Sequence, residues 1–381
     1  MPGVYVHIPF CAKACYYCDF HFKAHLEKKE RMICALSEEI RIRTADLPED
    51  AQERRAVSLY FGGGTPSVLS PAEWETLWRI LKDTYHILPD AEITAEVNPE
   101  DLSLPYLVFL KKTGINRLSI GIQSFDDQVL QWMNRRHTAS RAITAVQEAR
   151  EAGFDRISVD LMYGIPGMSA AQWEKQLDQA LALTPEHLSA YHLTIEPRTV
   201  FGVRCRKGQL TPVDERDSLI QYRILTDKLA QAGYRHYEIS NFARPGYEAR
   251  HNSSYWRQEP YIGFGPSAHS FDGTFRRWNI AHNDKYMQGV FSRDASWYEM
   301  EKLTEQDQYN EYLMTSLRTA DGVRKNEITS RFGKKYTALF ERCIASYLSS
   351  GQVLLSGPDT YRIAERHWML SDSIIRDLFL V

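Results

Sequence analysis

The run Cys11-Ala12-Lys13-Ala14-Cys15-Tyr16-Tyr17-Cys18 follows directly on a strand-like stretch, residues 4–9, and places three thiols within eight residues. Such thiols can surround one soft-metal centre, because thiolates select iron-sulfur clusters or zinc over harder cations. A structural zinc site normally has four protein ligands, and the nearest side chains able to complete one are His7, His21 and His25. A 4Fe-4S cluster on three cysteines instead has one open iron that can chelate a small molecule, and the missing fourth cysteine favours this cluster. Buried thiols without a metal are the remaining alternative.

The whole chain has the composition of an ordinary globular protein. Its 381 residues with 43% hydrophobic content suffice for two or three domains. The formal net charge of -3 provides no global basic field for nucleic acid, and no apolar run approaches the roughly 18 residues that span a bilayer. Peripheral membrane contact stays open. Residues 1–3 lead straight into the first strand, so we expect no signal peptide and a cytoplasmic protein with reduced thiols.

Up to about residue 235, strand-like runs alternate with amphipathic helical runs, which is the pattern of a parallel sheet wrapped by helices. Six such units are too few for a closed barrel of eight, so the sequence predicts an α/β fold with a partial (β/α)6 barrel. The expected strands are residues 4–9, 56–62, 92–98, 117–124, 156–163 and 188–196.

Alternation along these strands predicts a polar barrel interior. Helices cover the outside of such a barrel, so the polar face of each strand should line the lumen. The residues on this face are Thr94, Glu96, Asn98, Ser119, Gly121, Gln123, Ser158 and Asp160. Ligands of parallel barrels bind at the carboxyl ends of the strands, where the cysteine run and Gly62-Gly63-Gly64-Thr65-Pro66 both fall. The glycine backbone allows a close approach to a ligand, although a tight turn explains it equally well.

The cysteine spacing, three residues and then two with the aromatic Tyr17 before the last thiol, resembles the signature of the radical S-adenosylmethionine (SAM) superfamily. The resemblance implies a partial barrel in which Cys11, Cys15 and Cys18 hold a 4Fe-4S cluster. It also implies that the open iron binds SAM, which an electron from the cluster cleaves to a radical.

Further motifs resemble one branch of that superfamily, which contains oxygen-independent coproporphyrinogen III oxidase and the HemW family of haem chaperones. They are Tyr5-Val6-His7-Ile8-Pro9-Phe10, residues 62–66, Ala95-Glu96-Val97-Asn98-Pro99, Gly121-Ile122-Gln123-Ser124-Phe125, Asn134-Arg135, residues 160–167 and Tyr237-Glu238-Ile239-Ser240-Asn241-Phe242. The resemblance implies cofactor contacts for Tyr5, Tyr17, Gly63, Gly64, Thr65, Glu96, Gln123, Arg135 and Asp160. These residue types suit such contacts, because a carboxylate can accept hydrogen bonds from two ribose hydroxyls and a guanidinium can donate two parallel hydrogen bonds to a carboxylate. A buried ion pair is the alternative for Glu96 or Asp160.

The repeating pattern ends near residue 235, and residues 236–300 read as a barrel extension rich in glycine and aromatics. Its centre, His251-Asn252-Ser253-Ser254-Tyr255-Trp256, resembles the His-Asn-x-x-Tyr-Trp segment of the haem chaperones. A neutral imidazole is a common axial ligand of haem iron, so His251 is the expected haem-binding residue. His192 and His269 compete for this role, and a hydrogen-bonded loop histidine is the other alternative.

Residues 301–381 are expected to form a smaller α+β domain. Helices over residues 304–317, 325–332 and 337–349, followed by a hairpin over 351–355 and 361–364, resemble a winged-helix order. Residues 303–381 carry ten Lys or Arg against ten Asp or Glu, so a basic excess for DNA phosphates is lacking. Packing on the barrel or contact with a partner is favoured instead.

Two functions of different classes compete for this chain, a radical decarboxylase and a haem carrier. The decarboxylase pattern has a further cysteine two residues beyond the third ligand, where this chain has Phe20, and a longer arm ahead of the cysteine run, where this chain has ten residues. These departures favour a haem chaperone that holds a 4Fe-4S cluster with exchangeable SAM and delivers haem to an acceptor, such as a respiratory-chain haem protein. Coproporphyrinogen III oxidase is the alternative and a radical SAM enzyme on another substrate is a third, so whether the chain is an enzyme stays open.

Overall fold

The structure, a computed structural model, describes residues 3–46 and 54–380. Within them, a central sheet has the strand order β12-β11-β10-β9-β1-β2-β3-β4-β5-β6-β8-β7, and β1 to β6 run parallel to one another. These six strands are β1 (Gly3–Ile8), β2 (Arg55–Gly63), β3 (His86–Val97), β4 (Arg117–Gln123), β5 (Ile157–Tyr163) and β6 (His187–His192). They match the six predicted strands, and the predicted partial barrel is confirmed.

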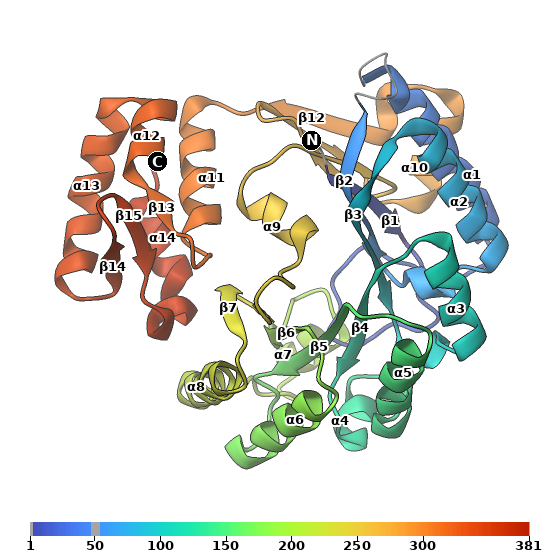
Figure 1. The fold of residues 1–381 in the computed structure, drawn as a ribbon, viewed down its shortest axis with the longest axis horizontal. Coiled ribbons are helices and arrows are strands. Elements are labelled where there is room, and N and C mark those ends of the chain that lie inside the picture. The colour runs from blue at the N-terminus through green and yellow to red at the C-terminus, as the bar shows by residue number, and fades with distance from the viewer. Residues whose placement is uncertain (1–2, 47–53, 381) are drawn as a thin grey trace.

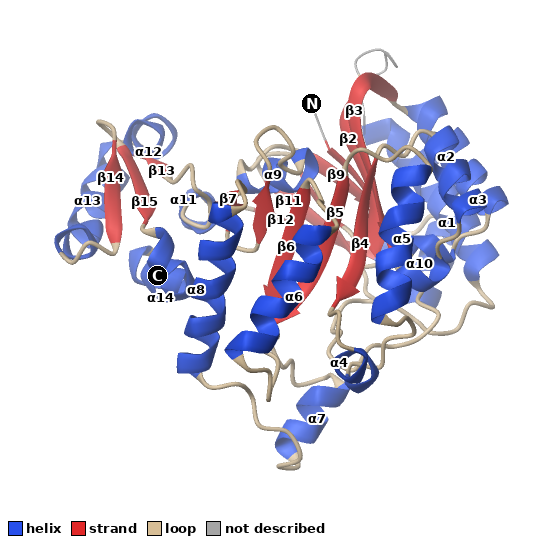
Figure 2. Ribbon diagram, turned by 60° about the horizontal axis from the view of Figure 1, so that its bottom comes forward, coloured by secondary structure: helices blue, strands red, loops and turns tan. Residues whose placement is uncertain are grey.

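Helices cover the outer face of the parallel strands (Figure 1). The helices of this part of the chain are α1 (Lys29–Ile42), α2 (Pro71–Thr84), α3 (Leu104–Thr113), α4 (Asp127–Trp132), α5 (Ala139–Glu151), α6 (Ala170–Ala182), α7 (Val200–Arg206) and α8 (Glu215–Gln231). Several begin at strong local signals. Ser70 and Ser169 each form a capping box with the third helical residue, Glu73 and Gln172 respectively. Figure 2 shows α4 and α7 beyond the carboxyl ends of the strands.

The strand alternation divides the barrel into an apolar outer layer and a polar interior. On β4, Leu118, Ile120 and Ile122 are fully buried within the main hydrophobic core. Burying each such side chain stabilises the fold by about 1.5–3 kcal/mol. The intervening Ser119 points inward, where its hydroxyl donates to the Asp160 carboxylate of the next strand at 3.1 Å. The polar residues of neighbouring strands therefore meet inside the barrel, as the alternation predicts.

Six further strands extend the parallel sheet on both sides, and none of them was predicted. On one side β9 pairs parallel with β1, and β10, β11 and β12 follow antiparallel. On the other side, β8 and β7 pair antiparallel beyond β6. The added elements are β7 (Arg235–Glu238), β8 (Asn241–Ala243), α9 (Arg250–Trp256), β9 (Tyr261–Phe264), β10 (His269–Phe271), β11 (Phe275–Asn279), α10 (Asn283–Ser292) and β12 (Tyr298–Lys302). In Figure 1, α9 lies on the opposite side of the sheet from α1, α2 and α3.

The C-terminal residues form a small α+β domain beside the barrel (Figures 1 and 2). It contains α11 (Glu305–Ser316), β13 (Val323–Arg324), α12 (Lys325–Phe332), α13 (Lys334–Ser349), β14 (Val353–Ser356), β15 (Thr360–Ile363) and α14 (Ser371–Leu378). Its strands form an antiparallel sheet in the order β13-β15-β14. This element order matches the predicted winged-helix arrangement. Among the helices that the structure describes, none combines the length and apolar character needed to cross a bilayer.

The carboxylate of Glu39 ties α1 to the added strands. Glu39 is fully buried and accepts hydrogen bonds from Gly265 N at 2.7 Å, Asn279 Nδ2 at 2.8 Å and Tyr286 Oη at 2.5 Å. It also forms an ion pair with the buried Arg43 at 3.5 Å. One carboxylate thus accepts hydrogen bonds from β11, from α10 and from the turn after β9, and it connects these three elements to α1.

We predict that Glu39→Ala lowers the free energy of unfolding by about 3 kcal/mol or more, because the change removes a buried carboxylate and leaves the buried donors of Gly265, Asn279 and Tyr286 without their acceptor. Urea unfolding measures this difference. Glu38→Ala is the matched control, because its carboxylate lies on the same helix but pairs with the exposed Arg41 and Arg293. Its cost should stay below about 1 kcal/mol. Equal costs for the two variants would contradict the importance of the buried contact.

Candidate functional site

The loop after β1 carries the cysteine run and is bonded to the glycine turn after β2. Gly64 N donates to Ile8 O at 2.9 Å, and Thr65 N donates to Phe10 O at 2.7 Å. A Cβ atom at Gly64 would lie 2.6 Å from Phe10 O, so only glycine fits at this position. The Thr65 hydroxyl lies 3.3 Å from Cys11 Sγ and donates to it. The two predicted segments are thus brought together at the carboxyl end of the barrel.

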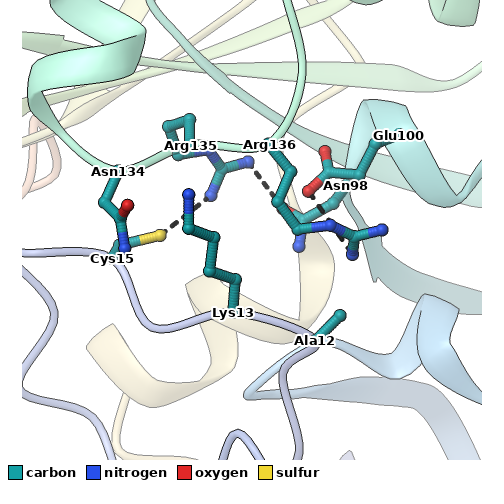
Figure 3. Close-up of a pocket in the computed structure, with 8 residues that line it drawn as sticks. All are labelled: Ala12, Lys13, Cys15, Asn98, Glu100, Asn134, Arg135 and Arg136. Atoms are coloured by element: carbon teal, nitrogen blue, oxygen red, sulfur yellow. Dashed lines mark hydrogen bonds and ion pairs between the residues drawn. The ribbon is translucent and has the colours of Figure 1, made fainter.

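Arg135 connects the cysteine run to the lumen (Figure 3). Its Nη1 donates to Cys15 Sγ at 3.5 Å, and its Nη2 donates to Asn98 Oδ1 at 2.7 Å and Gly121 O at 2.6 Å. Burial alone would lower the pKa of Arg135, but the nearby Tyr17, Cys15 and Glu100 outweigh burial and raise this pKa above its usual value. The guanidinium therefore stays charged beside the thiols. The residues around this small pocket are Ala12, Lys13, Cys15, Asn98, Glu100, Asn134, Arg135 and Arg136.

The three thiols lie in a setting that disfavours free thiolates. Burial raises the pKa of Cys11 to about 12 and that of Cys18 to about 11, and the neighbouring thiols add to both shifts. Thiolates at these positions therefore need a bound cation, which is the chemistry of a metal centre with sulfur ligands. Within residues 3–46 and 54–380, no group of three or more His, Cys, Asp or Glu side chains is arranged to hold a single metal ion.

Glu96 lies in the lumen, next to the glycine turn. Its Oε1 accepts from Tyr60 Oη at 2.7 Å, and its Oε2 accepts from Gly63 N at 3.2 Å. Burial raises the pKa of Glu96 to about 7; the nearby Asp160 adds to this rise, and the hydrogen bonds from Tyr60 and Gly63 oppose it. Sequence reasoning missed Tyr60, although Ser58, Tyr60 and Gly62 share one strand face and the same alternation rule would have placed it inside.

Asp160 lies inside the barrel in the middle of β5, and Gln123 ends β4. The Asp160 carboxylate accepts from the hydroxyls of Ser119 at 3.1 Å and Ser158 at 3.3 Å. Burial raises the pKa of Asp160, whereas these hydroxyls lower it. Gln123 adopts a left-handed backbone with φ 66°, an uncommon conformation for a residue with a long side chain and one that clusters at functional sites. On β1, Tyr5 Oη lies 3.0 Å from His7 Nδ1.

His251 on α9 lies at the other end of the barrel from the cysteine run. Its Nδ1 is 2.9 Å from Ser58 Oγ, and a Cβ atom at Gly3, the first residue of β1, would lie 3.1 Å from Nδ1. Its Nε2 is 2.7 Å from Tyr255 Oη, and burial lowers its pKa to about 3, so the ring is neutral. Both ring nitrogens are therefore engaged. Of the competing histidines, His192 ends β6 and bonds to Ser218 Oγ at 3.0 Å, and His269 starts β10.

These features define the class of protein. The sequence profile of the Radical SAM superfamily matches residues 5–180, which contain the cysteine run, the glycine turn, Glu96 and Asp160. A solved structure of coproporphyrinogen III oxidase (HemN) from Escherichia coli, a radical SAM enzyme, aligns with a TM-score of 0.85 at 25% identity. The alignment covers 99% of this chain and 90% of the other. The chain is a radical SAM protein.

Several relatives identify its family within that class. The heme chaperone HemW of Bacillus subtilis is 34% identical over 358 residues, covering 93% of each chain. HemW of Escherichia coli is 34% identical, covering 99% of this chain and 98% of the relative. A mitochondrial radical S-adenosyl methionine domain-containing protein 1 from Danio rerio is 31% identical, covering 99% and 87%. This chain belongs to the HemW family.

We predict that Glu96→Gln changes how the stability of the ligand-free protein depends on pH. The pKa of Glu96 is raised from 4.5 to about 7 in the folded protein, so the parent loses stability as the pH rises through this window. The glutamine variant should escape this loss. We expect it to gain about 1–2 kcal/mol over the parent between pH 4.5 and pH 8, measured by urea unfolding, since partial exposure screens the carboxylate. A difference that does not vary with pH would show that the substitution changes packing only.

Proposed function

We propose that this chain is a haem chaperone, which binds haem and delivers it to an acceptor protein while holding a 4Fe-4S cluster and an exchangeable SAM. The single observation that carries this proposal is the full-length similarity to heme chaperones, which extends over 93% or more of this chain in the Bacillus subtilis and Escherichia coli relatives. The similarity includes α9 and the C-terminal domain, beyond residues 5–180 that match the superfamily profile.

The cluster is proposed to be held by Cys11, Cys15 and Cys18. The donor set fits, because three thiols lie in one short loop and Arg135 and Thr65 donate to two of them. When bound, such a cluster supplies an open iron for the amino and carboxylate groups of SAM. The proposed cofactor contacts are Tyr5, Tyr17, Gly63, Gly64, Thr65, Glu96, Gln123, Arg135 and Asp160. This set includes the carboxyl of Glu96 and the guanidinium of Arg135, and such a pair of groups suits a zwitterionic nucleoside.

Haem is proposed to bind at α9, because this helix carries His251 in the motif that resembles the haem chaperones. The imidazole is neutral, as an iron ligand must be. Coordination of iron by Nε2 requires the hydrogen bond between Nε2 and the Tyr255 hydroxyl to break. The proposed recipient is a haem protein, such as one of a respiratory chain. Nucleic acid is not a proposed partner, because the net charge is -3.

Coproporphyrinogen III oxidase is the second candidate, and the likeness of the fold to the Escherichia coli enzyme favours it. Phe20 opposes it, since this residue stands where the decarboxylase pattern has a further cysteine, and its side chain is 76% exposed beside the cysteine run.

We predict that replacing Cys11, Cys15 or Cys18 by serine abolishes the broad visible absorbance of the anaerobically reconstituted protein, because each change removes a thiolate ligand. Bound iron and sulfide should fall with the absorbance. Cys34→Ser is the matched control, since this exposed cysteine lies on α1, and it should retain a full cluster. Full iron and sulfide in any of the three loop variants would remove that residue from the ligand set.

We predict that the reconstituted parent retains haem through gel filtration, with a Soret band, and does not decarboxylate coproporphyrinogen III when SAM and a reductant are present. Both measurements use the same anaerobic preparation, so a missing cluster cannot explain the absence of turnover. Haem retention without turnover supports the chaperone. Decarboxylation without haem retention would establish the oxidase instead.

A further inference from the structure

The imidazole of His251 is held between the central sheet and its own helix. Its Nδ1 lies 2.9 Å from Ser58 Oγ on β2, and its Nε2 lies 2.7 Å from Tyr255 Oη, one turn further along α9. His251 and Ser58 are each only 1% exposed, so this contact is shielded from bulk water. One ring nitrogen therefore faces a residue of the sheet, and the other faces a side chain of the same helix.

The backbone at His251 is anchored independently of the ring. His251 N and Arg250 N donate to the two carboxylate oxygens of Glu92, at 3.0 Å and 3.1 Å. Glu92 is itself buried and lies 3.6 Å from the buried guanidinium of Arg117. Because this backbone is fixed, the ring can move only by rotation of its own side chain, and the contacts of its two nitrogens set its orientation.

The two sides of the ring differ in how they are closed. A Cβ atom at Gly3 would lie 3.1 Å from His251 Nδ1 and 3.0 Å from Ser58 Oγ, so the backbone of β1 runs directly beside Nδ1. A planar macrocycle cannot approach this nitrogen without displacing β1, which pairs with both β2 and β9. The contact at Nε2 is the phenol of Tyr255, which is a side chain that can rotate. Nε2 is therefore the nitrogen that haem iron can reach.

The chemistry of a neutral imidazole gives the hydroxyl at Nδ1 a role. Burial lowers the pKa of His251, so the ring carries a single proton on one of its two nitrogens. Nε2 can bind iron only when this proton is on Nδ1, where it needs an acceptor, and Ser58 Oγ lies within hydrogen-bond distance. A histidine that binds a metal generally donates its other N–H in this way, which fixes the tautomer and makes the ligating nitrogen more basic.

We propose that Ser58 is a positioning residue for haem binding. Its Oγ accepts the Nδ1 proton of His251 and so presents the lone pair of Nε2 to the iron, while the Tyr255 hydroxyl donates to Nε2 when haem is absent. The inference rests on the proposed function and adds a residue of β2, outside the motif on α9, to the haem site. The two hydroxyls have opposite effects, because one supports the iron-binding nitrogen and the other competes with iron for it.

Anaerobic Soret titration of the full-length reconstituted chain tests the role of Ser58. Ser58→Ala should raise the haem dissociation constant about tenfold, because the buried Nδ1–H loses its acceptor. The complex that still forms should have a higher haem midpoint potential, since a ring without this hydrogen bond donates less charge to iron. The matched control is Ser37→Ala, at a buried serine whose hydroxyl donates to Ile33 O within α1, and it should bind haem as the parent does.

Tyr255→Phe tests the competing hydroxyl in the same titration. It should lower the haem dissociation constant about fivefold, because iron no longer has to displace a hydrogen bond from Nε2. Phenylalanine retains the ring that packs against His251 and Tyr261, with centroids 5.0 Å and 4.5 Å away. Cluster absorbance should be unchanged in all three variants. Weaker haem binding by Tyr255→Phe would contradict a competing role for this hydroxyl.

His251→Ala, titrated alongside, should bind haem more weakly than Ser58→Ala. Parent-like affinity and midpoint potential in Ser58→Ala would overturn the positioning role, and so would parent-like binding by His251→Ala. In either case, haem binding by the parent would leave the proposed chaperone function intact. A parent that retains no haem would overturn the proposed function itself, and the role of Ser58 with it.

Discussion

The bonding of the loop after β1 to the turn after β2 is the constraint on which the candidate site depends. Parallel pairing brings the carboxyl ends of both strands to one edge of the sheet. The backbone hydrogen bonds from Gly64 and Thr65 then fix the start of the cysteine loop at the mouth of the barrel. Gly64 is required because the two backbones approach too closely for a side chain. Arg135, which follows α4, donates both to Cys15 on this loop and to Asn98 and Gly121 in the barrel, so one side chain ties the thiols to the lumen.

Much of the barrel could be predicted because its signals are local. A strand with one polar face and one apolar face, such as β4, defines its own orientation once helices are expected on the outside. The same rule correctly places Ser119 and Asp160 in contact inside the barrel. The C-terminal domain was also predictable, because α12 ends at Gly333, which has φ 85°, and the hairpin of β14 and β15 turns at Gly357, which has φ 71°.

The added strands β9 to β12 could not be predicted for the opposite reason, since their pairing depends on contacts distant in sequence. They are three to five residues long, too short for alternation to be distinguished from chance. Their position is fixed by β1 and by the buried Glu39, which lies 226 residues from its partner Gly265. Similarly, the motif at His251 predicts a chemical role but carries no information on which way the ring points, because Ser58 and Glu92 come from separate strands.

A layer of aromatic rings lies inside the barrel, next to α9. The rings of Tyr5, Tyr60 and His251 stack with centroids 5.0–6.4 Å apart, and Tyr255 packs against His251 at 5.0 Å. Burial lowers the pKa of His251 and raises the pKa values of Tyr5, Tyr60 and Tyr255, so this layer is uncharged at neutral pH. Uncharged, closely packed rings disfavour ions among them. Under the proposed function, this aromatic layer would lie between a cargo on α9 and the chemistry at the cysteine loop.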